Sequence, residues 1–418
     1  MSMRLSGRGL RALLAVVAAA VMIGAGPGAA GAAVPGCADR AGAQPGRLGS
    51  GSELHGGAAV SACRARAVGG NSAVTPQTLI ERWNGSSWKK VSSPSPGSIV
   101  NVLSGVAATS ASNAWAVGSF VKGTAFQTLI ERWNGTTWTQ APSPNPAGAT
   151  RDNQLASVAA TSASNAWAVG SYVSGAASAL TQTLVLRWNG TRWTQVPSPS
   201  PGGTANPDRL AGVAATSASN AWAVGSYTTG SGFRTLTLHW NGTTWKQVPS
   251  PNSGTASDAN TLSGVAAIAA SDAWAVGSYA SGGGFRTLTL HWNGTTWKKV
   301  PSPNAGSGKN GLLAVAATSA SNAWAVGYFA GRTANRALIE HWDGKSWTLV
   351  PSPGSSNHLL SGVAATSASN AWAVGSVVER WNGKTWAMAS IPNPGSNGNN
   401  LSAVTATSAS NAWAVGSS

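Results

Sequence analysis

The sequence predicts an all-β protein, a seven-bladed β-propeller built from four-stranded antiparallel blades. Three observations lead to this fold class. Near-copies of "SASNAWAVGS" occur seven times at intervals of about 50 residues. Near-copies of "RWNGTTW" alternate with them and also occur seven times. Each interval contains four short segments typical of strands and no helical periodicity, and four strands per repeat of this length are typical of a propeller blade.

The first two strands of each repeat are predicted on either side of the "SASN" turn. Around Trp115 they cover residues 103–109 and 114–120. Because successive side chains of a strand point to opposite faces, Trp115 and Val117 share one face, and small alanines the other. A large ring facing small residues suits the space between two packed blades. The predicted structural core consists of Trp115, Trp167, Trp222, Trp274, Trp324, Trp372 and Trp413. The alternative interpretation is a ring of tryptophans that stack on sugars.

The other two strands are predicted on either side of the "WNG" motif. In the same repeat "TLIERW" covers residues 128–133 and "TWTQ" covers residues 137–140. Asn134 and Gly135 are expected to form a tight two-residue hairpin turn, because both residues accept positive φ. The prolines of "PSPNP" then end the fourth strand, since proline cannot donate to a sheet ladder.

The ring can close in two ways. Residues 57–69 hold a degenerate half repeat, with Arg66 in place of the tryptophan, and residues 401–418 hold an intact one. Joining one blade from both chain ends removes an open edge, whereas burying an unpaired arginine is costly. We therefore expect residues 401–418 to complete the first blade as a closing half blade. In the alternative, residues 57–69 hold that place and residues 401–418 are surplus.

The first 32 residues have the pattern of a secretory signal peptide. Three arginines precede an apolar run, and Ala30-Gly31-Ala32 fits a cleavage site. We expect cleavage near Ala32, a flexible N-terminal arm over residues 33–56, a propeller over residues 57–418 and a secreted, extracellular protein. No other segment approaches the roughly 18 apolar residues of a membrane-spanning helix.

The chain has two cysteines, Cys37 and Cys63. In an oxidising compartment a single pair is most simply a disulfide, which here would tie down the N-terminal arm. The alternative is lipidation of Cys37, because "VPGC" at residues 34–37 is similar to a lipobox.

The motif pair "SASNAWAVGS" and "RWNGTTWTQAPSP" resembles a group of exported bacterial repeat proteins of the β-propeller type, which look like relatives of the kelch and Asp-box (sialidase-type) propellers. The resemblance covers residues 57–418, and it implies a fold rather than an activity. Residues 135–138, "GTTW", are similar to the end of an Asp-box hairpin, but Trp133 stands where that box has its aspartate.

Residues capable of catalysis occupy repeat positions and do not form clusters. The residue two places before the first tryptophan of the WNG motif is a glutamate in four repeats and a leucine in three. Equivalent positions on a ring lie far apart, so we expect no close carboxylate pair of the kind that glycosidases use. We expect these glutamates to lie on the surface. The four glutamates are Glu81, Glu131, Glu340 and Glu379. Histidine or arginine fills the next position, and no histidine has metal-ligand spacing. We expect no catalytic residue, no metal site and no cofactor.

The connections that vary between repeats indicate a ligand-binding face. The loop after "AVGS" and the stretch after "PSP" differ from copy to copy, and a four-stranded meander places both on the same side of the disc. Variable loops on a rigid scaffold are the usual place for recognition. The candidate ligand-face residues are Lys122, Arg151, Arg209, Arg234, Arg286, Lys309, Arg332 and Arg336.

The overall charge favours an anionic partner. The formal net charge is +16, although only 9% of the residues are charged. We expect a secreted, monomeric, non-catalytic binding module for a glycan, an anionic cell-envelope polymer or a protein, and no nucleic-acid partner, since no basic cluster occurs. The alternatives are a structural extracellular scaffold, or a glycan-active enzyme with its site in the central channel.

Overall fold

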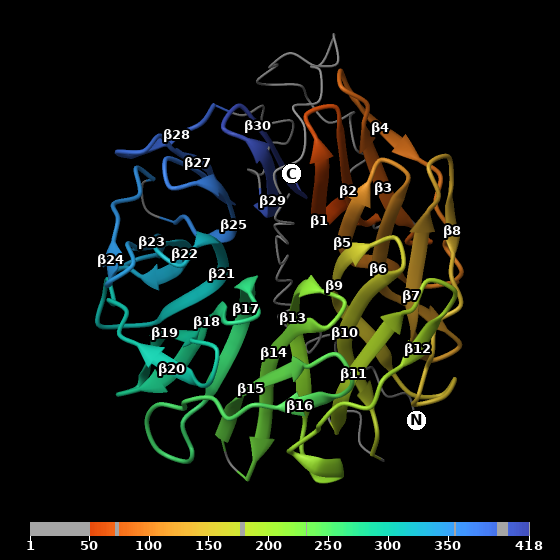
Figure 1. Cartoon of the computed structure of the whole chain (residues 1–418), viewed down its shortest axis with the longest axis horizontal. Helices are drawn as coiled ribbons and strands as arrows, with labels where there is room; N and C mark the ends of the chain where they lie inside the picture. The colour runs from red at the N-terminus through yellow and green to blue at the C-terminus, as the bar shows by residue number, and fades with distance from the viewer. Residues whose placement is uncertain are drawn as a thin grey trace, which may run out of the picture.

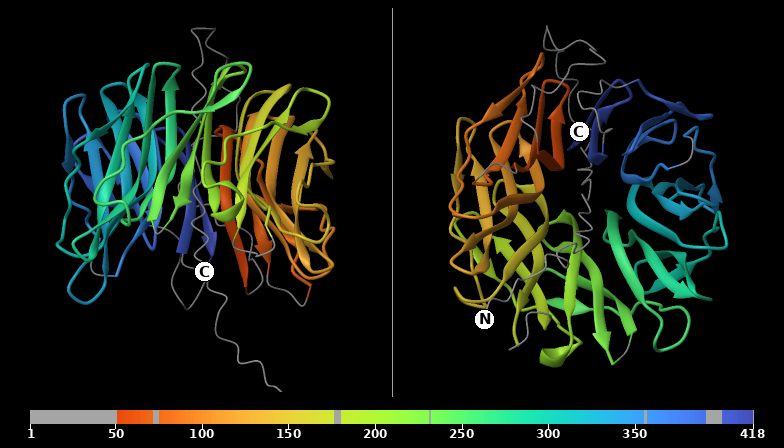
Figure 2. Two further views of the ribbon diagram at one scale, coloured as in Figure 1. Left: turned by 90° about the horizontal axis from the view of Figure 1, so that it is seen from below. Right: turned by 180° about the vertical axis from the view of Figure 1, so that it is seen from behind.

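The computed structural model describes residues 51–71, 75–175, 180–230, 232–354, 357–390 and 400–417. These residues form a ring of antiparallel sheets around a central axis, with the strands running roughly along that axis (Figures 1 and 2). Seven sheets have four strands each, in the chain order of a simple meander, and an eighth sheet has two. The predicted all-β propeller with seven four-stranded antiparallel blades is therefore confirmed.

Each blade is built from an inner, a second, a third and an outer strand, counted from the centre of the ring. Blades are numbered along the chain, from blade 1 (β1–β4) to blade 7 (β25–β28). The inner strands are β1 (Ser52–Ser61), β5 (Asn101–Ser110), β9 (Asn153–Ser162), β13 (Asp208–Ser217), β17 (Asn260–Ala269), β21 (Asn310–Ser319) and β25 (Leu360–Ser367). The second strands are β2 (Arg64–Asn71), β6 (Asn113–Lys122), β10 (Asn165–Val173), β14 (Asn220–Thr229), β18 (Asp272–Ser281), β22 (Asn322–Ala330) and β26 (Asn370–Gly375).

The third and outer strands complete the blades. The third strands are β3 (Thr78–Trp83), β7 (Ala125–Trp133), β11 (Thr181–Trp188), β15 (Gly232–Trp240), β19 (Gly284–Trp292), β23 (Asn335–Trp342) and β27 (Val378–Trp381). The outer strands are β4 (Trp88–Val91), β8 (Trp138–Gln140), β12 (Trp193–Gln195), β16 (Trp245–Gln247), β20 (Trp297–Val300), β24 (Trp347–Leu349) and β28 (Trp386–Met388). A short 3₁₀ turn, η1 (Gly203–Ala205), lies between β12 and β13.

The hydrophobic core lies between neighbouring blades. Trp115 and Val117 of β6 pack into blade 3, where they meet Leu186 and Trp188. Ala114 and its alternate neighbours on β6 face blade 1 instead. The two-residue alternation of a strand therefore gives each blade one bulky face and one small face, and the bulky face of one blade fills the space beside the next.

The WNG turn is longer than the predicted two-residue turn. Trp133 pairs directly with Trp138, so the turn has the four residues between them. The Asn134 side-chain oxygen accepts hydrogen bonds from the backbone N–H groups of Thr136 and Thr137, both at 2.9 Å. Gly135 takes a positive φ of 108°, and Asn134 does not. The asparagine thus acts through its side chain, as in an Asx turn, and only the glycine needs the left-handed backbone.

The first blade takes its inner strands from the N-terminal side of the chain. β1 pairs with β2, and β2 pairs with β3, so the expectation that residues 401–418 complete this blade is wrong. β1 also begins at Ser52, so the predicted flexible arm over residues 33–56 ends too late and the propeller starts earlier than residue 57.

Arg66 is buried at 2% exposure, and two contacts offset the cost of burying it. Its Nη2 donates to the backbone oxygen of Ala111 in the next blade at 2.7 Å, and its guanidinium lies 5.4 Å from the Trp133 ring. Burial, followed by the charges of Arg82 and Arg64, lowers the pKa of Arg66 to about 10. A planar cation therefore replaces the tryptophan in this slot.

The last two strands form a separate half blade. β29 (Asn400–Ser408) pairs with β30 (Asn411–Ser417), and β29 lies between β25 and β1. Figure 1 shows this half blade beside β1 at the junction of the two chain ends. Ala403, Trp413 and Val415 pack against blade 1. The ring thus closes with an eighth, two-stranded position, and the half blade covers the flank of blade 1 that would otherwise be open.

Two other expectations concern residues that lie outside the described part of the chain. The signal peptide over residues 1–32 and Cys37 lie outside them. Cys63 is disulfide-bonded. Within the described part of the chain, no helix is long and apolar enough to cross a membrane.

Candidate functional site

The strand register defines two rims of the disc. In blade 2, Ser110 pairs with Asn113 at one end of the sheet, and Lys122 pairs with Ala125 at the other. The SASN and WNG turns therefore share one rim, which we call the turn rim. The second-to-third-strand connections and the links to the next blade share the opposite rim, which we call the loop rim. Both variable connections thus lie together.

All eight candidate ligand-face residues lie in or beside loop-rim connections. Six side chains are exposed, and those of Arg234 and Arg286 are half-buried. The six exposed side chains belong to Lys122, Arg151, Arg209, Lys309, Arg332 and Arg336. They come from blades 2 to 6 and the connections between them, so they are spread along the loop rim and do not converge on a single point.

Some of these basic groups have local structural partners. Arg286 Nη1 donates to the Gly306 carbonyl at 2.9 Å, and Arg151 Nη1 donates to the Ser174 carbonyl at 3.3 Å. The Arg336 guanidinium lies 6.0 Å from the Phe329 ring. These arginines help to hold neighbouring loops, whereas no side-chain contact engages Lys122 or Lys309 among the interactions of the described residues.

The aspartates of the loop rim are occupied by backbone groups. Asp152 Oδ1 accepts the Phe126 N–H at 2.9 Å, and Asp208, which is fully buried, accepts the Gly202 N–H at 3.1 Å. Asp258 Oδ2 accepts the Thr255 N–H and the Thr255 hydroxyl. These acids stabilise the loops by accepting hydrogen bonds from backbone groups.

Sequence reasoning missed a set of buried polar side chains that hold the loop rim in place. The first residue of five inner strands is a fully or almost fully buried polar residue: Asn101, Asn153, Asp208, Asn260 or Asn310. Asn101, for example, donates to the Pro76 and Gly97 carbonyls and accepts the Gly97 N–H. The sequence feature that could have revealed them is the Asn or Asp that recurs at this position among residues that vary from copy to copy.

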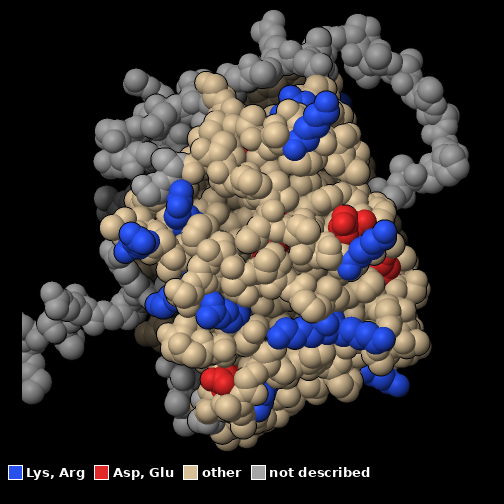
Figure 3. Space-filling model, turned by 90° about the vertical axis from the view of Figure 1, so that its left-hand side faces the viewer, with Lys and Arg blue, Asp and Glu red and all other residues tan. Residues whose placement is uncertain are grey.

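The side of the disc that carries β20, β24 and β28 shows how the charge is spread. Basic side chains lie singly or in short rows among uncharged residues, with few acidic groups between them (Figure 3). On this face the described residues are therefore weakly and diffusely positive, without a dense basic cluster.

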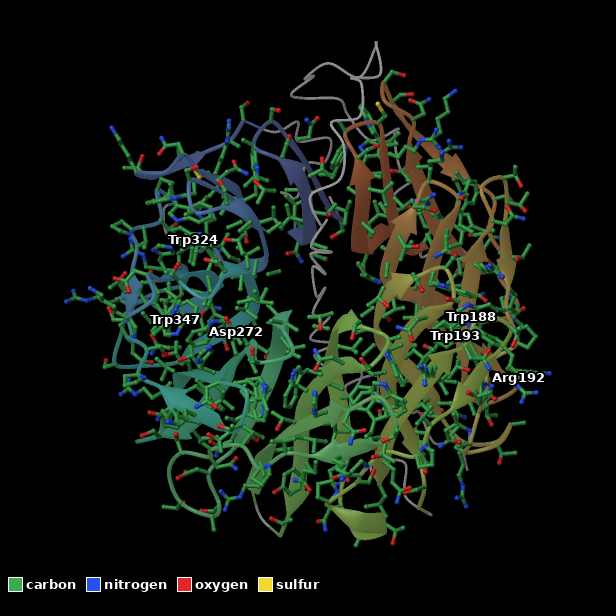
Figure 4. All side chains as sticks on the ribbon, in the orientation of Figure 1. Trp188, Arg192, Trp193, Asp272, Trp324 and Trp347 are labelled. Atoms are coloured by element: carbon green, nitrogen blue, oxygen red, sulfur yellow. The ribbon has the colours of Figure 1, made fainter. Side chains whose placement is uncertain are left out.

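The tryptophans form the packing between blades. The core tryptophans of blades 2 to 6 are 0% exposed, so their rings are not available to stack on a sugar. Each lies beside the two WNG-motif tryptophans of the following blade, which we call its tryptophan pair. Trp115, for instance, lies 4.6 Å from Trp188 and 5.1 Å from Trp193, measured between ring centroids. Figure 4 shows Trp188 and Trp193 together in the outer half of their blade.

The alternating arginine and histidine position covers the core tryptophan. Arg132 lies over Trp115 at 5.3 Å, and His239 stacks on Trp222 at 4.3 Å with an interplanar angle of 23°. Both groups are planar, which explains why one replaces the other. Burial lowers the pKa of His239. His291, in the blade where Asp272 replaces the usual asparagine, bonds to that aspartate at 2.9 Å. These histidines have structural roles.

The four glutamates are buried, which corrects the expectation of surface residues. Glu131, Glu340 and Glu379 have no exposed surface, and Glu81 has almost none. The corresponding leucines, such as Leu186, pack against the core tryptophan of the preceding blade. Burial raises the pKa of Glu81 to about 7 and that of Glu131 to about 8, and it also raises those of Glu340 and Glu379. The alternation of side chains along the third strand could have predicted this burial, since the glutamate position lies on the same face of the strand as buried apolar residues.

The described residues contain no group of three or more histidine, cysteine, aspartate or glutamate side chains placed to hold a metal ion. The buried glutamates occupy different interfaces between blades, one to a blade. What the described side chains bring together is a rim of variable loops with exposed basic groups, mounted on a scaffold packed with tryptophan.

The fold is similar to that of solved propellers. The structure of Sqt1 from Chaetomium thermophilum matches at 10% identity with a TM-score of 0.55, covering 88% of this chain and 94% of that one. The same protein bound to the N-terminus of the ribosomal protein L10 matches at 11% identity with a TM-score of 0.51, covering 88% and 95%. A polysaccharide lyase, a PL25 ulvan lyase, matches at 8% identity with a TM-score of 0.49, covering 79% and 90%.

At these identities the likeness concerns the fold alone. No protein-family model and no curated protein sequence matches the chain.

Proposed function

We propose that this chain is an exported, non-catalytic binding module that recognises an extended anionic polymer, such as an acidic polysaccharide of the cell envelope, through the loop rim. The observation that carries this proposal is the placement of six exposed basic side chains along one rim, where the aspartates are bonded to backbone groups. A row of separated positive charges suits a ligand with repeated negative charges better than a small molecule.

The rigidity of the scaffold supports this function. Buried residues such as Asn101 and Asn153 hold the loops from inside, so the basic groups are presented with little freedom of the backbone. A preorganised surface loses less conformational entropy on binding. Sqt1, which has a similar fold, is bound to the N-terminus of the ribosomal protein L10 in one of its structures. A protein ligand on this rim is therefore the second candidate.

The test is a charge-removal variant with a matched control. The loop-rim variant combines Lys122→Ser, Arg209→Ser and Lys309→Ser. The control combines Arg192→Ser, Lys345→Ser and Lys384→Ser, which removes the same charges from exposed positions in WNG turns on the turn rim. Binding to teichoic acid and polygalacturonate is measured at low and high salt, with dextran as the neutral polymer.

We expect the loop-rim variant to bind about tenfold more weakly and the control to bind as the unchanged protein does, because three exposed ion pairs contribute about 0.5 kcal/mol each. High salt should weaken binding by the unchanged protein. Equal losses in both variants would indicate non-specific attraction to the net charge. Binding of dextran with no salt dependence, or no polymer binding at all, would contradict the proposal and favour a lectin, a protein ligand or a scaffold role.

A further inference from the structure

The interfaces between blades follow one rule. From blade 2 to blade 6, each core tryptophan contacts the tryptophan pair of the following blade, with ring centroids 4.6–5.1 Å apart. One ring of the pair is tilted against the core tryptophan, and the other meets it edge to face, at 88° for Trp115 and Trp193. Five equivalent interfaces therefore show what covers a core tryptophan.

The interface after blade 7 departs from this rule. The half blade contributes β29 and β30, and no described strand pairs with the outer side of β30. Trp372, the core tryptophan of blade 7, therefore has no tryptophan pair beside it among the described residues. It is half-buried, whereas its counterparts in blades 2 to 6 are 0% exposed. The hydrophobic cluster here has four buried members, where its neighbour one interface earlier has thirteen.

Arg380 of blade 7 also lacks one of the ring contacts that its counterparts make. Arg132 lies between two rings, 5.3 Å from Trp115 and 5.1 Å from Trp188, and Arg187 is placed in the same way. Arg380 lies 5.1 Å from Trp372 and has no second ring among the described residues. One face of its guanidinium is thus left where a tryptophan lies in the equivalent interfaces.

A backbone carbonyl of the half blade also lacks the indole N–H donor that its counterparts have among the described residues. In every four-stranded blade the alanine carbonyl of the SASN-type turn accepts the indole N–H of that blade's third-strand tryptophan, as Ala111 does from Trp133 at 2.9 Å. The seven acceptors are Ala62, Ala111, Ala163, Ala218, Ala270, Ala320 and Ala368. Ala409 is the counterpart in the half blade, and it accepts Arg380 Nη2 at 2.9 Å. Ala111 accepts an arginine and an indole together, so Ala409 has room for an indole as well.

The edge of β30 has the backbone register that a third strand needs. In blade 4, residues 221–226 of the second strand pair with residues 235–240 of the third. The counterparts of residues 221–226 in the half blade are residues 412–417, which carry the same sequence, "AWAVGS". An antiparallel strand added there would bring its tryptophan to Ala412, close to the Ala409 carbonyl.

We propose that the half blade is an acceptor site for a β-hairpin with two tryptophans five residues apart, supplied by a polypeptide segment outside residues 1–418 that adds a third and an outer strand to β30. Its first indole would donate to Ala409 and cover Arg380, and the pair would cover Trp372. A second copy of the propeller does not fit this role, since each of its described tryptophan hairpins already belongs to a four-stranded blade. The inference is independent of the loop rim.

The test uses the full chain and a synthetic peptide of residues 235–251, "TLTLHWNGTTWKQVPSP", taken from blade 4. Binding is followed by isothermal titration calorimetry, and the oligomeric state by light scattering. We expect saturation at one peptide per chain. A peptide with Trp240→Ala and Trp245→Ala should bind at least about tenfold more weakly, since these rings provide most of the buried surface.

Matched variants of the protein locate the site. Arg380→Ser should weaken peptide binding about fivefold, because it removes one cation–π contact from the site. Arg187→Ser, at the equivalent position of a filled interface, should leave peptide binding unchanged. Both arginines lie near the surface, and circular dichroism checks that the variants fold. Equal binding of the two peptides, equal effects of the two variants, no saturable binding, or a dimer of the protein alone that excludes the peptide would overturn the proposal.

Discussion

At the scale of the residue, the same repeat position can hold chemically different side chains when each finds its own way to be buried. Arg66 replaces a tryptophan and bonds to Ala111, and His239 replaces an arginine and stacks on Trp222. Glu131 replaces a leucine, and neither of its carboxylate oxygens has a hydrogen-bond partner among the described residues. Arg66 also leaves Nε and Nη1 without a partner among the described residues, but it keeps one hydrogen bond and one ring contact, whereas the Glu131 carboxylate has no hydrogen bond there.

The pKa of Glu131 leads to a prediction about pH. Its pKa is raised from 4.5 to about 8 in the folded protein, so between these values the native state holds a proton that the unfolded state has lost. The free energy of unfolding should therefore fall as pH rises from 5 to 8, by about 3 kcal/mol from this group. Urea unfolding of the unchanged protein and of Glu131→Leu measures the difference.

Glu131→Leu should be more stable than the unchanged protein at pH 8, and its stability should vary less with pH, because leucine fills the same position in blades 3, 4 and 5. The remaining pH dependence reports the other groups with shifted pKa values, which are Glu81, Glu340, Glu379, Asp208, His239 and His341. A variant that loses stability, or one that keeps the full pH dependence, would contradict the assignment of a protonated, buried Glu131.

At the scale of the element, the turn rim owes its order to contacts between two kinds of turn. A Cβ atom added to Gly135 in the WNG turn would lie 3.1 Å from the Cβ atom of Ser112 in the SASN turn. Gly190, Gly242 and Gly294 have similar positive φ values, and each lies against the equivalent serine of its own blade. The glycine of the motif is therefore required by backbone conformation and by packing together.

This requirement gives a prediction with an internal control. Gly135→Ala should destabilise the protein by about 2 kcal/mol, since a φ of 108° lies outside the left-handed region open to alanine and the added methyl group meets Ser112. Gly123→Ala, with a φ of 65° and nothing near its added Cβ, should cost about 1 kcal/mol or less. Chemical denaturation compares the two, and equal losses would show that packing against Ser112 has no effect.

At the scale of the whole molecule, the ring has seven complete positions and one half position, and its closure depends on the half position. β29 lies against β25 on one side and β1 on the other. Trp413 and Val415 cover the flank of blade 1, where Leu54 and Leu79 are buried. The ring would otherwise be open at the junction of its two ends.

Deletion of residues 400–418 tests this closure. We expect the free energy of unfolding to fall by on the order of 5 kcal/mol, because the apolar flank of blade 1 becomes exposed along with part of blade 7. Thermal unfolding followed by near-ultraviolet circular dichroism measures the change. The matched control is Ser408→Ala with Ser410→Ala, which changes only side chains in the turn of the half blade and leaves its packing on blade 1 in place. An unchanged melting temperature would mean that the half blade is surplus.

The sequence by itself determined the repeat, the four strands, the two faces of each strand and the common rim of the variable loops. These features depend on local patterns such as the alternation around Trp115 and the glycine of each WNG turn, which every copy repeats. A pattern that recurs in each blade meets the same surroundings each time, so one correct interpretation holds for all of them.

Only the tertiary structure decided how the ring closes and which polar residues are buried. The place of residues 401–418 depends on a competition between two distant half repeats for the edge of β3, and Arg66 succeeds there because Ala111 and Trp133 belong to the next blade. The burial of Glu131 depends in the same way on a neighbouring blade. These outcomes are set by contacts between segments far apart in the chain, and the free energy of such contacts is not a property of any one repeat.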